Sequence, residues 1–446
     1  MHVTILSLGT LGDVAPFVGL GAGLVARGHR VRLATYARYA EPIAGAGLDH
    51  HVLPGDPARL MNSEAARRIA RASGRPAAYD REQRALEQAL AAKARRVFDE
   101  AVEACRGTDL IVYSLTAAFA GSIAEAMELP AVQGFLVPVT PTRAFAPLLA
   151  KRAQSRLGGL GNLAAHLVAS WRFGNSFRQL QDDWRRESLG LPPLPVRLPY
   201  GGPLVEADRR RRPLLYGISP SVLPRPADWG DWIEMTGFWP QPLPPGWQPP
   251  TELEAFLEAG EPPLCIGFSS AGGGDGERMT GIVLEALAKV GRRAVLLSGW
   301  GALGDSVRSP LVHVAEKVPH AWLAPRVAAM VHAGGAGTSH EVFRAGVPSV
   351  VVPFTGDQFF WAARAAALGT APPPLPWWEL TAQQLAEAIE TVLGDPGYAR
   401  AASGLAGRIA GEDGVARAVA AIERQPLAAA HSAPGASSPN QALRTF

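Results

Sequence analysis

The stretch His332-Ala-Gly-Gly-Ala-Gly-Thr-Ser-His-Glu341 lies between an expected strand at 329–332 and an expected helix at 339–345. Its glycines let the backbone approach a ligand closely, and the helix that follows offers free N–H groups and the positive end of its dipole. Thr338 and Ser339 add hydroxyl donors, and His332 can donate a hydrogen bond to a phosphate oxygen. The pattern is typical of a diphosphate site that needs no metal ion, although a glycine turn that only caps the helix remains the alternative.

A second polar pair, Asp357-Gln358, follows the expected strand 349–352 and Pro353. An acidic residue beside an amide at the carboxyl end of a strand can bind neighbouring sugar hydroxyls. Surface polarity would explain this pair by itself. Its position soon after the glycine-rich stretch favours the sugar-binding interpretation.

The chain on either side of these motifs alternates strand and helix patterns. The expected strands lie at 3–8, 30–35, 110–113, 131–135 and 214–218 in the first half, and at 264–268, 294–297, 329–332 and 349–352 in the second. Strand–helix alternation with short connections predicts an α/β fold of two doubly wound parallel sheets. Ligands bind beyond the carboxyl ends of such strands, so the chemistry should lie after residues 8, 268, 332 and 352.

The length of 446 residues exceeds what one hydrophobic core holds, which indicates more than one domain. Prolines and tryptophans are dense between 220 and 263, a composition that excludes long helices and central strands. We expect a first domain at 1–222, a linker at 223–247, a second domain at 248–403, closing helices at 404–424 and a disordered tail at 425–446.

Composition excludes several classes of protein. The chain is 47% hydrophobic and 19% charged, which is typical of a globular protein, and its net charge is only +3. The basic run 209–212 is interpreted as a solvated loop, so no nucleic-acid partner is expected. Cys105 and Cys265 have no disulfide or metal spacing, which favours a cytoplasmic location. No apolar run is long enough to span a membrane, and the amino terminus fits a buried strand better than a signal peptide.

The loop Gly9-Thr-Leu-Gly-Asp-Val-Ala-Pro16 follows the first expected strand. Its glycines do not have the spacing of a dinucleotide fingerprint. In one interpretation, Asp13 caps a helix expected at 16–26, because aspartate is a favoured residue before a first helical turn. In the other, its carboxylate acts in the chemistry of the site.

Residues 332–358 resemble the donor signature of inverting, GT-B-fold glycosyltransferases of the UDP-glycosyltransferase superfamily. Within this superfamily the chain is most similar to sterol 3β-glucosyltransferases and their bacterial relatives, and next to glycopeptide-antibiotic glycosyltransferases. The segments that carry this similarity are 185–193, 219–226, 236–239, 353–361 and 372–381. The resemblance covers roughly residues 1–424. It implies transfer of a hexose, with inversion, from a UDP- or dTDP-sugar to a hydroxyl of an apolar acceptor, with no cofactor or metal beyond the donor.

The resemblance also assigns donor-binding roles. It implies that the diphosphate is held by His332 and by the backbone at Gly334, Gly335, Gly337 and Thr338, with a further phosphate contact from Ser270. It implies that Glu341 binds the ribose and that Val318 contacts the pyrimidine. Asp357 and Gln358 would bind the transferred sugar. The chain departs from the family pattern at Ser269, Ala321 and Ala333, where glycine, aspartate and a second histidine are usual. These departures leave the donor base and the sugar open.

On the acceptor side, the resemblance implies that Asp13 is the general base, because a carboxylate can take the proton of a hydroxyl that attacks the anomeric carbon. His29, His50 and His51 are weaker candidates. The expected acceptor-binding residues are Thr10, Phe135, Phe145 and Trp171. Trp171 belongs to an aromatic stripe with Phe173 and Phe177, and such a stripe can equally be part of the hydrophobic core.

Three other functions stay open at this point. The first is a macrolide or glycopeptide transferase that uses a dTDP-deoxysugar. The second is a catalytically silent GT-B protein that acts as an activator or binding partner, which turnover assays would separate from an enzyme. The third is a sugar-nucleotide epimerase, which would need no apolar acceptor pocket. A peripheral membrane contact and the oligomeric state also stay open.

Overall fold

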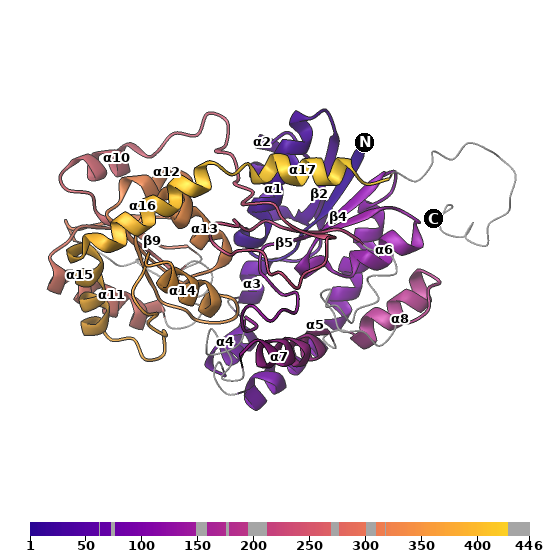
Figure 1. Cartoon of the computed structure of the whole chain (residues 1–446), viewed down its shortest axis with the longest axis horizontal. Helices are drawn as coiled ribbons and strands as arrows, with labels where there is room; N and C mark the ends of the chain where they lie inside the picture. Colours follow the sequence, from indigo (N-terminus) through magenta and orange to yellow (C-terminus); the bar gives the residue numbers. More distant parts are fainter. Residues whose placement is uncertain are drawn as a thin grey trace, which may run out of the picture.

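The computed structural model describes residues 1–61, 63–72, 76–148, 158–174, 178–194, 212–268, 276–299, 309–316 and 318–426. They form two lobes, each built on a parallel sheet with helices packed on it (Figure 1). The first lobe runs from indigo to magenta in the figure, and the second is mostly orange. This architecture confirms the expected α/β fold with two doubly wound parallel sheets.

The first sheet has seven parallel strands in the order β3-β2-β1-β4-β5-β6-β7. They are β1 (His2–Leu6), β2 (Arg30–Tyr36), β3 (Asp49–Leu53), β4 (Leu110–Ser114), β5 (Ala131–Phe135), β6 (Leu214–Tyr216) and β7 (Ile233–Met235). The helices of this lobe are α1 (Leu11–Ala26), α2 (Ala40–Gly45), α3 (Pro57–Met61), α4 (Glu64–Arg71), α5 (Pro76–Ala104), α6 (Ala120–Ala126), α7 (Gly158–Gly174) and α8 (Arg178–Ser188). The strand order reverses between β1 and β4, and a crevice opens at such a switch point.

The second sheet has five parallel strands in the order β10-β9-β8-β11-β12. They are β8 (Leu264–Gly267), β9 (Ala294–Leu297), β10 (Val312–Ala315), β11 (Ala329–His332) and β12 (Ser349–Val351). Its helices are α10 (Thr251–Glu258), α11 (Gly276–Val290), α12 (His320–Leu323), α13 (Ala336–Ala345), α14 (Gln358–Ala367), α15 (Ala382–Gly394) and α16 (Pro396–Ala410). Every residue of β4 and of β11 is buried, which is why these strands read as nearly continuous apolar runs.

Two helices next to the expected functional site begin earlier in the chain than the sequence predicts. Helix α1 begins at Leu11 rather than at residue 16, because Thr10 and Asp13 form a capping box there and Pro16 lies inside the helix. Asp13 therefore caps from the third helical position and not from a position before the helix. Helix α13 begins at Ala336 rather than at residue 339, so Gly337 and Thr338 lie in its first turn.

The segment expected as a linker is partly structured. Strand β7 lies within residues 223–247 and forms the edge of the first sheet, a place where a proline-rich segment is tolerated. After α16 the chain returns to the first lobe, where α17 (Gly414–Glu423) packs beside α1 (Figure 1). Val419 and Ile422 of α17 share a hydrophobic core with Leu20 and Leu24 of α1. The domain boundaries themselves stay predictions, and residues 427–446 of the expected tail lie outside the described residues.

The structure also places the two cysteines and allows a search for membrane-spanning helices and metal-binding clusters. Cys105 and Cys265 are buried free thiols, and burial raises the pKa of each to about 12. In the described part of the chain, no helix combines the length and the apolar character needed to cross a membrane. The same residues contain no cluster of three or more His, Cys, Asp or Glu side chains that could hold a metal ion.

Candidate active site

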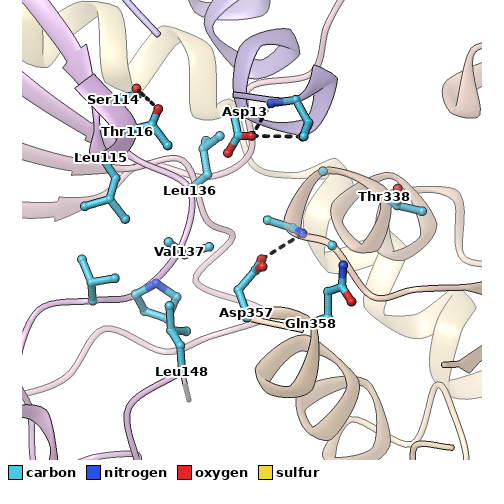
Figure 2. Close-up of a pocket in the computed structure, with 18 of the residues that line it drawn as sticks. Asp13, Ser114, Leu115, Thr116, Leu136, Val137, Leu148, Thr338, Asp357 and Gln358 are labelled. Atoms are coloured by element: carbon cyan, nitrogen blue, oxygen red, sulfur yellow. Dashed lines mark hydrogen bonds between the residues drawn. The ribbon is translucent and has the colours of Figure 1, made fainter. Parts of the chain in front are cut away.

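A cavity of about 450 Å³ lies where the carboxyl ends of the two sheets face each other (Figure 2). The first lobe lines it with Thr10, Gly12, Asp13, Ser114, Leu115, Thr116, Gly134, Leu136, Val137, Pro138, Val139, Pro147, Leu148, His166, Ala169 and Ser170. The second lobe lines it with Phe268, Ala333, Gly335, Ala336, Gly337, Thr338, Gly356, Asp357 and Gln358. A volume of this size suits a small-molecule site, and its walls combine apolar surface with a few polar groups.

The first turn of α13 forms one wall of the cavity. Gly335 caps the helix, and the N–H groups of Gly337 and Thr338 come before the first intrahelical hydrogen bond, which Ser339 donates to Gly335. Gly334 has a φ of +84°, and a Cβ there would lie 2.7 Å from Val351 Cγ1 and 3.0 Å from the carbonyl oxygen of Gln358. Glycine at this position therefore lets the loop turn tightly into the helix and leaves its N–H groups facing the cavity.

His332 ends strand β11 and is buried. Its Nδ1 accepts a hydrogen bond from the N–H of Gly334 at 3.1 Å, so the ring proton of the neutral imidazole is on Nε2. Burial, with His320 nearby, lowers the pKa of His332 to about 3, which keeps the ring neutral at physiological pH. Nε2 is also buried, and it has no hydrogen-bond partner among the described residues. A buried N–H group left unpaired costs free energy, and a ligand oxygen would satisfy it.

Asp357 and Gln358 begin α14 and line the cavity opposite the first lobe (Figure 2). Asp357 Oδ2 accepts hydrogen bonds from the N–H of Ala336 at 3.3 Å and from Trp361 Nε1 at 3.1 Å. Gln358 Oε1 accepts from the N–H groups of Phe354 and Thr355 at 2.7 and 3.1 Å. These bonds fix both side chains, and they leave one carboxylate oxygen as an acceptor and one amide nitrogen as a donor.

Asp13 reaches the cavity from the first turn of α1 (Figure 2). Its Oδ2 accepts hydrogen bonds from Thr10 N at 2.7 Å and from Thr10 Oγ1 at 3.0 Å. Burial raises the pKa of Asp13, and the two bonds from Thr10 oppose that rise. The carboxylate lies against Gly9, where φ is +117° and a Cβ would be only 2.4 Å from Oδ2. Glycine is therefore needed there for Asp13 to keep this orientation.

The two lobes bring Asp13 and Asp357 into one electrostatic environment. Burial first, and the charge of Asp13 second, raise the pKa of Asp357 to about 6. The helix starts also approach each other, since a Cβ at Gly337 would lie 3.2 Å from the Cα of Gly12. The cavity thus combines a carboxylate from each lobe with the N-terminus of α13.

Several expected site residues do not line this cavity. Val318 is buried in a hydrophobic cluster of the second lobe, and Glu341 pairs with Arg344 at 2.7 Å. His332 lies one residue before the lining residue Ala333. Ser270 lies outside the described residues.

The three aromatic residues expected at the acceptor site lie outside the lining of this cavity. Phe135 is 1% exposed and packs edge-on against Tyr216, and Phe145 contacts His166 and Phe360. Trp171 lies on α7 and is 61% exposed. The apolar wall comes instead from the loops after β4 and β5 and from α7, namely Leu115, Leu136, Val137, Pro147, Leu148 and Ala169. Phe135 lies within a strand whose sheet is covered on both faces, so its side chain points into the core, whereas loops beyond the carboxyl ends of such strands face a ligand.

The remaining base and aromatic candidates lie elsewhere. His29 binds Glu423 at 3.0 Å, His51 binds Glu100 at 2.8 Å, and His50 lies near the carbonyl of Thr35 at 3.4 Å; none lines the cavity. The side chain of Phe173 and all of Phe177 lie outside the described residues.

Sequence reasoning missed four polar lining residues, which are Ser114, Thr116, His166 and Ser170. Ser114 is the last residue of β4 and Thr116 follows it; their hydroxyl groups form a hydrogen bond of 2.8 Å. His166 and Ser170 are one helical turn apart in α7, where most other residues are apolar. That spacing was the signal that could have identified them.

The chain matches known families over both lobes. The "Glycosyltransferase family 28 N-terminal domain" matches residues 3–146, and the "Erythromycin biosynthesis protein CIII-like, C-terminal domain" matches residues 283–422. A sterol 3-beta-glucosyltransferase of Arabidopsis thaliana is 33% identical over 95% of this chain and 68% of its own length. One from Emericella nidulans is 34% identical over 95% of this chain but only 30% of its own length.

A solved structure shares the fold. The glycotransferase of kitacinnamycin superposes with a TM-score of 0.66 at 20% identity, covering 95% of this chain and 98% of that one. Both the sequence similarity and the structural similarity extend over both lobes. The chain therefore belongs to the UDP-glycosyltransferase superfamily of GT-B-fold glycosyltransferases.

Proposed function

We propose that the protein transfers a hexose from a UDP- or dTDP-sugar to a hydroxyl of an apolar acceptor, sterol-like or polyketide-like, with inversion and without a metal ion. One observation carries this proposal: Asp13 of the first lobe and Asp357 of the second line a single cavity together with the first turn of α13. The apolar wall of the first lobe supports an apolar acceptor. The sterol-glucosylating activity named for the Arabidopsis relative supports the same class.

The donor diphosphate binds at the start of α13 in this proposal. The N–H groups of Gly337 and Thr338, the helix dipole and His332 Nε2 supply positive potential and hydrogen bonds to the phosphate oxygens. Gly334 and Gly335 allow the close approach of the backbone. Asp357 accepts a hydrogen bond from one sugar hydroxyl, and Gln358 donates one to its neighbour. Glu341, Ser270 and Val318 keep the roles implied by the family resemblance: ribose, phosphate and pyrimidine contacts.

The transfer itself is a single displacement. The acceptor oxygen forms a bond to the anomeric carbon while the bond from that carbon to the diphosphate oxygen breaks, and the electron pair leaves with the diphosphate. The hydroxyl proton passes to Asp13 as it becomes acidic in the transition state. Thr10 holds the carboxylate in place through its two hydrogen bonds. The charge on the leaving group is stabilised by the helix start and His332.

Transfer should persist in excess chelator, because protein donors rather than a cation hold the diphosphate. The measurement is initial rate with and without EDTA, followed by added Mg²⁺ or Mn²⁺. We expect the rate to stay within about twofold across these conditions, as removal of an essential metal would cost several kcal/mol of transition-state stabilisation. Loss of activity with EDTA that either ion restores would contradict the proposed leaving-group chemistry.

Asp357→Asn should lower hexose transfer by about tenfold or more and leave nucleoside-diphosphate affinity nearly unchanged, because charge-assisted hydrogen bonds to the sugar are about twice as strong as neutral ones. The amide oxygen can still accept from Ala336 and Trp361, so the loop should stay in place. Turnover and UDP or dTDP binding by calorimetry are compared. Asp395→Asn is the matched control, since Asp395 caps α16 away from the cavity. Equal losses of turnover and of nucleotide affinity would separate Asp357 from the sugar.

The proposed activity is tested by incubating the protein with UDP- and dTDP-hexoses and panels of sterol, polyketide and flavonoid acceptors, with products identified by mass spectrometry. A glycosylated acceptor of inverted anomeric configuration is the expected result. Nucleotide binding without product in every combination would favour a silent GT-B protein instead. Conversion of the donor sugar with no acceptor present would indicate an epimerase.

A further inference from the structure

Helix α7 turns polar side chains toward the protein interior. Asn162, His166 and Ser170 follow one another at helical spacing, and they are only 2%, 2% and 3% exposed. Polar groups on an inward helical face need partners, because a buried polar group without a hydrogen bond costs free energy. The three residues therefore call for an explanation in terms of what they contact.

The first two contacts attach α7 to the segment that follows β5. Asn162 Nδ2 donates to the carbonyl oxygen of Arg143 at 3.0 Å, and His166 Nε2 lies 3.0 Å from the carbonyl oxygen of Phe145. A carbonyl can only accept, so Nε2 of His166 carries the ring proton and Nδ1 carries a lone pair. Burial lowers the pKa of His166 to about 4, so the ring stays neutral at physiological pH. Asn162 is satisfied by this arrangement, but His166 has a second nitrogen to satisfy.

Two polar atoms of this helical face make no hydrogen bond to the described residues, and both belong to residues that line the cavity. His166 Nδ1 and Ser170 Oγ have no hydrogen-bond partner among the residues that the structure describes, whereas Asn162 does not line the cavity at all. The same cavity lining includes the apolar residues Pro147, Leu148 and Ala169, of which Ala169 precedes Ser170 in α7. An apolar ligand that carried no second polar group would leave both atoms desolvated and unpaired.

The segment that holds His166 leads to the end of the cavity away from Asp13. Phe145, whose carbonyl holds His166, is three residues before Leu148 in the chain. Figure 2 shows Leu148 at the end of the cavity opposite Asp13. A ligand whose reacting hydroxyl lies at Asp13 would therefore present its far end to His166 and Ser170.

We infer that His166 and Ser170 form a second recognition site in the acceptor cavity, which binds a hydroxyl of the acceptor other than the one that receives the sugar. This inference rests on the proposed transfer to an apolar acceptor. A hydroxyl fits both atoms at once, since it can donate to Nδ1 of His166 and accept from Oγ–H of Ser170. A ketone fits only the serine, and a hydrocarbon end fits neither. The acceptor class is accordingly a rigid apolar molecule with polar groups at both ends.

The test uses three 3β-hydroxysteroids that differ only at C17, where they carry a hydroxyl, a ketone or hydrogen. Their binding to the full chain is measured by calorimetry in the presence of UDP. One net hydrogen bond is worth about fivefold in affinity, so the wild-type protein should prefer the diol over the ketone, and the ketone over the C17-deoxy steroid, each by about threefold to fivefold.

Each variant should remove one of the two differences in affinity. Ser170→Ala should abolish the preference for the ketone over the deoxy steroid, and His166→Leu should abolish the preference for the diol over the ketone. Asn162→Leu is the matched control for His166→Leu, because it removes the same kind of bond between α7 and a backbone carbonyl without changing a cavity atom. It should keep both preferences. Ser170→Ala breaks no hydrogen bond within the described protein, so it tests the inference even if His166→Leu fails to fold.

Equal affinity of the wild-type protein for the three steroids, or no binding of any of them, would overturn the inference. A preference for the ketone over the deoxy steroid that is retained in Ser170→Ala would overturn it as well. Sugar transfer to the same steroids is measured separately with UDP- and dTDP-hexoses. Selective binding of the diol without transfer to any of the three steroids would contradict the proposed transfer to sterol-like acceptors and leave the second recognition site standing.

Discussion

Asp13→Asn should turn over at least about a hundredfold more slowly than the wild-type protein, because general-base catalysis contributes about 10²–10⁴-fold. The structure makes this variant informative. Asn keeps an oxygen where Oδ2 accepts from Thr10 N and Thr10 Oγ1, so the start of α1 should stay capped. The variant should therefore melt near the wild-type temperature and still bind donor and acceptor. Steady-state kinetics, thermal melting and calorimetry measure the three properties.

The pH dependence supplies a second measurement on the same carboxylate. A base must be deprotonated to act, so kcat/KM should rise with pH through the pKa of Asp13 in the free protein. Burial raises that pKa above its ordinary value, which should move the acid limb to higher pH than an exposed aspartate would give. The limb should disappear in Asp13→Asn.

Asp413→Asn is the matched control, since Asp413 accepts from the N–H of Ala416 at the start of α17, away from the cavity. It should keep wild-type turnover. Wild-type activity in Asp13→Asn would exclude Asp13 as the base. Loss of activity that follows only from unfolding would leave Asp13 with a capping role alone.

The second large effect is expected at His332. His332→Ala should lower turnover by about 10²-fold, since a preorganised donor to developing charge is worth roughly 2.7–4 kcal/mol. The two ring nitrogens of this histidine have different environments and can have separate functions: Nδ1 accepts a hydrogen bond from the N–H of Gly334, and Nε2–H is buried without a partner among the described residues. His332→Asn can keep the first function, because an amide oxygen can occupy the place of Nδ1, and it removes the second.

Turnover of His332→Asn decides between the two functions. A loss as large as in His332→Ala places the effect on the Nε2–H group and so on the diphosphate. Recovery to near wild-type turnover would show that His332 only orders the loop. His340→Asn is the control, because His340 is also a buried histidine whose Nε2 has no hydrogen-bond partner among the described residues. Its ring stacks on that of Phe238, with the two centroids 3.9 Å apart. Its replacement should lower the melting temperature with little effect on turnover. Unchanged turnover in a folded His332→Ala would remove His332 from the mechanism.

The local motifs were predictable from the sequence because they depend on neighbouring residues. Glycines after a buried strand and an acidic–amide pair after the next strand indicate a ligand at the carboxyl edge of a sheet, and the strands at 329–332 and 131–135 were predicted with the boundaries that the structure has. The start of α1 was misplaced because proline at a first helical turn is a strong signal, whereas the capping box of Thr10 and Asp13 determines the actual start.

The apolar wall of the cavity was not predictable in the same way. Phe135 and Phe145 looked suitable because of their chemistry, but whether an aromatic ring faces a cavity or a core depends on which surface packs against it. The short edge strand β7 was missed for a related reason, since its pairing with β6 comes from the sheet and not from its own composition.

The sequence by itself determined the fold class, the two sheets and the position of the glycine-rich motif between a strand and a helix. Alternation of buried strands and helices and the spacing of glycines are local properties of the chain. Only the tertiary structure decided that Asp13 and Asp357 share one cavity, since they lie in different lobes and meet where the start of α1 contacts the start of α13. It also decided that His166 and Ser170 face that cavity. The physical reason is that the surfaces enclosing a side chain come from distant parts of the chain. These surfaces determine the pKa of the side chain and which of its polar atoms remain without a hydrogen-bond partner.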